Sequence, residues 1–109
     1  MLHQFIGADR RADFDRAVQR AGKTLSTGAA LFALRVPMER LYTLLADDSL
    51  DAWAFCPEQG MMATHYMVSS VSVVTWGIRG GVFRAAADAQ HLVSTAEVEA
   101  LAETPQNPR

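Results

Sequence analysis

The chain has 109 residues, half of them hydrophobic, with a net charge of −2 and a single cysteine, Cys56. This length suits one domain that buries about two-thirds of the surface its unfolded chain exposes, so stability requires neither a disulfide nor a metal. A net charge near zero argues against a general nucleic-acid binder. The lone cysteine and the absence of a signal-peptide pattern in the first residues predict a reducing, cytoplasmic location.

An uncharged run of 20 residues extends from Gln59 to Ile78. Its length is that of a membrane-spanning helix, but seven of its residues are polar, and hydrocarbon strongly disfavours each unpaired polar group. The run is also rich in β-branched residues. It therefore predicts strands of a sheet and no membrane span.

The first half of the chain predicts two helices and a strand between them. Apolar residues at helical spacing indicate a helix from Arg11 to Leu25, with Asp9 capping its start. A short buried strand is expected from Ala29 to Val36. Pro37 suits the first position of a second helix, which ends at 47–49.

The middle of the chain predicts three strands. Leu50 to Cys56 is apolar on both alternations, as a central strand would be, and 57–60 reads as a hairpin loop. The uncharged run is too long for one ordinary strand. We divide it into strands from Met61 to Val68 and from Val71 to Arg79.

The pair Gly80-Gly81 predicts a further hairpin. A two-residue turn sets Ile78 opposite Phe83 and Trp76 opposite Ala85, all on one face. An alanine-rich helix over 82–93 is the alternative, because alanine strongly favours helix. Beyond it, Ser94 and Glu97 match a capping box that begins a short terminal helix.

These elements predict an α+β fold in the order α-β-α-β-β-β-β-α. We expect one two-layer domain over residues 1–103, followed by a flexible tail over 104–109. The helices are expected on one face of a mostly antiparallel sheet of about five strands.

Catalytic and metal-binding patterns are weak. Cys56 and His65 could form a nucleophile and a base, with Asp51 or Glu58 as the orienting carboxylate. The expected hairpin pairs Ala52 with His65, which separates thiol and imidazole by roughly 13 Å at the usual strand rise. We therefore expect no enzyme activity and no catalytic residue.

No metal or cofactor is expected either. The three histidines stand at no spacing that places metal ligands on one face; they are His3, His65 and His91. Some large apolar residues could line a ligand pocket, although core packing is the preferred interpretation. These residues are Trp53, Trp76, Met61, Met62, Tyr66 and Met67.

Charge is unevenly divided along the chain. Residues 1–40 hold seven basic and four acidic side chains, whereas 41–109 hold three basic and eight acidic ones. Asp47, Asp48 and Asp51 cluster where the second helix meets the next strand, which predicts a negative surface. Its partner would be a protein with a basic surface, including a second copy that presents residues of the first helix. Those basic residues are Arg16, Arg20 and Lys23.

The expected function is that of a small non-catalytic interaction protein. An inhibitor, adaptor or immunity-type partner, encoded by a bacterium, a phage or a mobile element, would bind through the acidic half or an exposed sheet edge. One alternative is a small-molecule-binding domain or small enzyme with the Trp/Met/Tyr pocket. The other is a nucleic-acid-binding regulator that uses the basic first helix.

Overall fold

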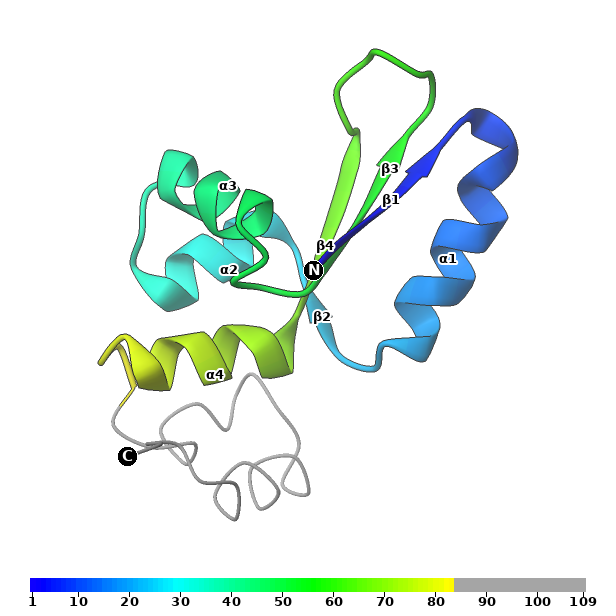
Figure 1. Ribbon diagram of the computed structural model, residues 1–109. Helices are drawn as coiled ribbons and strands as arrows, with labels where there is room; N and C mark the ends of the chain where they lie inside the picture. Colours follow the sequence, from blue (N-terminus) through cyan, green and yellow to red (C-terminus); the bar gives the residue numbers. More distant parts are fainter. Residues whose placement is uncertain (84–109) are drawn as a thin grey trace.

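A computed structural model describes residues 1–83 of the chain (Figure 1). Its elements in order are β1 (Leu2–Ile6), the 3-10 helix η1 (Ala8–Arg10), α1 (Arg11–Arg20), β2 (Thr24–Leu25), α2 (Thr27–Leu34), α3 (Met38–Ala46), β3 (Ala52–Cys56), β4 (His65–Ser69) and α4 (Ser70–Arg79). The strands form one sheet in the order β1-β3-β4-β2. The α+β class is confirmed.

The sheet differs in detail from the expected one. Within residues 1–83 it has four strands, and it is mixed: β1 is parallel to β3, while the pairs β3/β4 and β4/β2 are antiparallel. Strand β1 pairs with a segment about fifty positions later, Phe5 lying beside Phe55. No hairpin turn connects these two strands, so no local sequence signal predicts their pairing. Strand β1 was not predicted from the sequence.

The helices cover both faces of the sheet, not one (Figure 1). Phe14 of α1 contacts Phe55 of β3, while Tyr42 of α3 contacts Tyr66 of β4. Tyr66 pairs with Ala54, the neighbour of Phe55, and successive residues of a strand point to opposite faces. Helix α1 therefore packs on one face, and α3 packs on the other.

The larger core lies on the face opposite α1. Its side chains come from α2, α3, α4 and the sheet. Complete burial of one Val or Leu side chain stabilises the fold by about 1.5–3 kcal/mol. The buried members are Ala30, Leu34, Leu41, Leu44, Leu45, Leu50, Ala52, Val68, Val73 and Val74.

Two helices and the central strand agree with the sequence patterns. Helix α1 begins at Arg11 as predicted but ends at Arg20, just before Gly22, whose φ of +82° no helix accommodates. Asp9 does not cap it, because η1 precedes α1 and places Arg10 at the N-cap position. Helix α3 was predicted in this place, but it begins at Met38, and Pro37 is its N-cap residue and not its first residue. Strand β3 lies inside the sheet between two neighbours.

The predicted strand from Ala29 to Val36 is wrong, because residues 29–34 belong to helix α2. The Ser26 side chain accepts a hydrogen bond from the backbone N–H of Ala29 and so caps the helix. Arg35 ends it in the left-handed conformation, with φ 57°. A short helix that is apolar all round has the same pattern as a buried strand, which explains the error.

The predicted strand from Val71 to Arg79 is also wrong, because residues 70–79 form α4. The hairpin register that set Ile78 opposite Phe83 fails with it. Ser69 caps this helix by accepting a hydrogen bond from Ser72 N–H. The residues buried along α4 are Ser70, Val73, Val74 and Gly77, a helical i, i+3, i+4, i+7 pattern that the β-branched composition concealed.

The connection between β3 and β4 is longer than predicted. It spans residues 57–64. His65 therefore pairs with Phe55, whereas the predicted four-residue loop would have paired His65 with Ala52. The strand predicted to begin at Met61 accordingly begins at His65, four residues later. The predictions for 84–109, including the alternative strand or helix, the capping box at Ser94 and the tail over 104–109, lie outside the described residues.

Candidate partner-binding site

Strand β1 forms one edge of the sheet, and its backbone shows which groups face outward. Ala52 N–H donates to the Met1 carbonyl, and Gly7 N–H donates to the Cys56 carbonyl. Because the N–H and C=O of one strand residue point to the same side and alternate along the strand, the odd-numbered residues bond to β3. The backbone groups of Leu2, Gln4 and Ile6 therefore face away from the sheet.

Asp48 occupies the first of these outward positions. Its Oδ1 accepts a hydrogen bond from Leu2 N–H at 3.3 Å. Asp48 lies in the turn between α3 and β3 with φ 62°, a left-handed conformation that Asp tolerates better than most residues. The next outward groups, on Gln4 and Ile6, have no recorded partner within the described part of the chain.

This edge lacks the features that usually prevent strand pairing. Natural edge strands are protected by charged side chains, prolines, bulges or short length. β1 has five residues with the sequence LHQFI and contains neither a formal charge nor a proline. Gln4 is exposed, and Ile6 retains 42% of its accessible surface. The opposite edge, β2, has only two residues.

The three predicted aspartates come together at the start of β1 and β3. All are exposed, and each already makes a contact. Asp47 accepts from Ser49 N–H at 3.0 Å, and Asp51 lies 2.7 Å from the Met1 amino group. The Ser49 hydroxyl and its N–H, with Arg40 nearby, hold the pKa of Asp47 below its ordinary value.

A shallow pocket of about 320 Å³ opens beside these aspartates. Asp48 and Asp51 line it together with Trp76 and Arg79 of α4. The arginine and the Met1 amino group offset the two carboxylates, so the pocket is mixed in charge. The acidic surface predicted from sequence is therefore partly neutralised at this pocket.

The three predicted basic residues lie along the second half of α1 and in the segment that follows it. Arg16 is ion-paired with Asp13 on the same helix. Arg20 is exposed in the last turn of α1, whereas Lys23 lies in the following turn. The Lys23 carbonyl accepts from Ser70 N–H, which places Lys23 at the start of α4.

The Cys56 and His65 pair does not assemble. His65 pairs with Phe55, so it shares that residue's face of the sheet, while Cys56 points to the other face. His65 instead lies 2.9 Å from the Thr64 hydroxyl and near the ring of Phe14. Among residues 1–83, no three His, Cys, Asp or Glu side chains stand close enough to hold a metal ion.

The aromatic and methionine side chains do not converge on one pocket. Trp53 stacks on His3 on the α1 face, while Trp76 lines the pocket beside Asp51. Met61 and Met62 are exposed, by 59% and 85%. Tyr66 packs against Tyr42, and burial raises the pKa of its hydroxyl.

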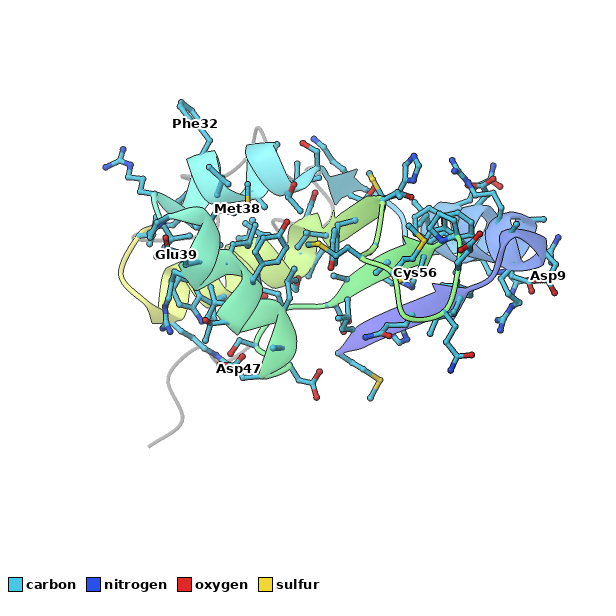
Figure 2. All side chains as sticks on the ribbon, turned by 90° about the horizontal axis from the view of Figure 1, so that it is seen from above. Asp9, Phe32, Met38, Glu39, Asp47 and Cys56 are labelled. Atoms are coloured by element: carbon cyan, nitrogen blue, oxygen red, sulfur yellow. The ribbon has the colours of Figure 1, made fainter. Side chains whose placement is uncertain are left out.

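Figure 2 shows two of the exposed features on different parts of the molecule. Phe32, 84% exposed on α2, points outward, while Met38 stands at the start of α3 and Asp47 at the other end of that helix. Cys56 lies within the sheet layer. These positions separate the aspartate cluster from the exposed apolar residues of α2.

The residues missed from sequence are those of the β1 edge. The segment LHQFI has no alternation of apolar and polar residues and is only five residues long, so no period-2 pattern marked it as a strand. Within the described residues, no helix is both long and apolar enough to cross a membrane. No family model matches the chain, and no curated protein or solved structure matches it.

Proposed function

We propose that this chain is a non-catalytic protein-interaction domain that binds its partner by strand addition at the open edge of β1. The observation that best supports this proposal is that the backbone groups of Gln4 and Ile6 face outward on an edge strand without charge or proline. Each offers one N–H and one C=O to an incoming strand. Main-chain hydrogen bonds of this kind provide affinity in many strand-addition complexes.

The aspartate cluster supports this proposal in a secondary role. Asp47 and Asp48 stand beside the Leu2 end of the edge, so a partner strand with basic residues there would be steered toward it. The ion pairs within α1 make the nucleic-acid alternative less favourable, because Arg11 and Arg16 are matched by carboxylates. The small-molecule alternative has only the shallow, mixed-charge pocket near Trp76.

Site-specific photo-cross-linking in the producing cell tests the proposal. A benzophenone amino acid replaces Gln4 on the edge or, in a matched control, Gln19 on the exposed face of α1. We expect a cross-linked protein, identified by mass spectrometry, from the Gln4 position and not from Gln19. The product should disappear when Ile6→Lys places a charge on the edge. Cross-linking at Gln19 alone would contradict the proposal.

A further inference from the structure

We infer that the strand added at β1 is β1 of a second copy, in antiparallel orientation, so that two sheets join into one across a twofold axis. This inference rests on the proposed function and names its partner. Gln4 and Ile6 provide the donors and acceptors on both copies at once. A strand with this arrangement is complementary to itself when it runs in the opposite direction.

The Asp48 contact selects the register. Because Leu2 N–H is already bonded to Asp48, the fully available residues are Gln4 and Ile6. An antiparallel pair that uses both sets Gln4 opposite Ile6 of the second copy, and Ile6 opposite its Gln4. This arrangement forms four main-chain hydrogen bonds and leaves the Asp48 contact intact. The twofold axis then passes beside Phe5.

The side chains near this axis are compatible with the pairing. The two Phe5 residues face each other as a non-hydrogen-bonded pair, the arrangement in which cross-strand side chains approach closest. Phe5 already packs edge-on to Phe14 at 6.0 Å, with Arg10 over its ring at 5.2 Å. Pairing therefore extends an existing aromatic cluster, and it places no charged residue of β1 in the new ladder.

The helices leave room for the joined sheet. Phe14 of α1 contacts both Phe5 and Phe55, so the helix lies over β1 and β3. With strands about 4.8 Å apart, the two copies of α1 would lie on the same face at about 10 Å from each other. That separation is the ordinary distance between packed helices. The second copy thus adds a helix contact without a clash of these two elements.

Sedimentation of the purified full chain tests the pairing. We expect a species of twice the 11.9 kDa chain mass that dissociates on dilution. Gln4→Pro removes one outward N–H, which an edge strand tolerates in the monomer, and should raise the dimer dissociation constant at least about tenfold. The matched Gln4→Val keeps the N–H and should leave the dimer in place. Circular dichroism checks that both variants fold.

Cysteine cross-linking tests the register independently. In a Cys56→Ala background, Phe5→Cys should form an intermolecular disulfide, because paired Cα atoms at this position lie about 4.5 Å apart. Gln4→Cys should not, since its two copies would be about 8–9 Å apart across the axis. The reverse result would overturn the proposed pairing.

The two proposals fail in different ways. A chain that stays monomeric at every concentration and forms no Phe5→Cys disulfide overturns self-pairing. If photo-cross-linking at Gln4 then captures a different protein, strand addition at β1 stands with another partner. If it captures nothing, the proposed function is overturned as well.

Discussion

The ring of Phe83 lies directly against Gly77 of α4. A Cβ added at Gly77 would stand 2.5 Å from Phe83 Cε2 and 3.4 Å from Leu34 Cδ2. In most helices Gly→Ala stabilises by roughly 1 kcal/mol. Here the sign should reverse, because the new methyl group displaces an aromatic ring that packs on the core. We expect Gly77→Ala to lower the free energy of unfolding by about 1–3 kcal/mol in urea titrations.

Gly28 supplies the matched control for this substitution. It also lies in a helix, α2, and an added Cβ there would meet nothing within 4 Å. Gly28→Ala should therefore stabilise the protein by about 0.4–1 kcal/mol. In a Phe83→Ala background the cost of Gly77→Ala should shrink. Equal effects of the two Gly→Ala changes would show that the Phe83 contact does not limit the space at Gly77.

The backbone of Asp48 is in the left-handed conformation, and its side chain accepts a hydrogen bond from Leu2 N–H. Asp48→Ala loses the acceptor and disfavours the conformation, so it should destabilise by about 1–2 kcal/mol. Asp48→Asn retains an acceptor oxygen and tolerates the same φ, and its cost should stay below about 0.5 kcal/mol. Chemical denaturation of both variants measures the difference. A loss as large for Asn as for Ala would contradict this account.

Asp47 should contribute to acid sensitivity. Its pKa is lowered in the folded protein, mainly by the Ser49 hydroxyl and N–H. A lowered folded pKa means that the contribution to stability is present above the ordinary pKa and is lost as pH falls through the folded value. The stability advantage of wild type over Asp47→Asn should therefore be present at neutral pH and vanish in acid, as the pH falls through the lowered pKa of the folded protein. Thermal unfolding across this range measures it, and a difference independent of pH would exclude the mechanism.

Cys56 should be structural. It is a free thiol with 9% of its surface exposed, and it points away from His65. Cys56→Ala should cost about 1 kcal/mol, as expected for a small buried group, and should leave partner binding unchanged. Labelling of the native protein by a thiol reagent should be slow. Fast labelling, or lost binding in a folded Cys56→Ala variant, would assign the thiol another role.

The sequence predicted the elements whose periodicity is unambiguous. Helices α1 and α3 have a polar face and an apolar face, and β3 is apolar on both faces because it is inside the sheet. Helix α2 is apolar all round, and α4 contains Val71, Val73, Val74 and Thr75, so local propensity favoured strand in both. Packing on a shared core overrides that propensity. Ser26 and Ser69 were the usable signals that a helix begins. The hydroxyl of each serine accepts a hydrogen bond from the backbone N–H three residues later.

The candidate site was less accessible to sequence reasoning. An exposed sheet edge was expected in general terms, and the clustering of Asp47, Asp48 and Asp51 was anticipated from their spacing. Which strand forms the edge depends on the pairing of β1 with β3, and the paired residues are fifty positions apart in the sequence. The direction of the Gln4 and Ile6 backbone groups follows only from that pairing.

The pairing of β1 with β3 also constrains the order of folding. Strands β3 and β4 are joined by residues 57–64 and can close early, whereas Phe5 must find Phe55 across about fifty residues of chain. Loop closure over that distance costs more entropy, so we expect the contacts between β1 and β3 to form after the transition state for folding. Substitutions in β1 should therefore accelerate unfolding while changing the folding rate little. The strand that offers the binding edge would then be the first to detach from the native sheet.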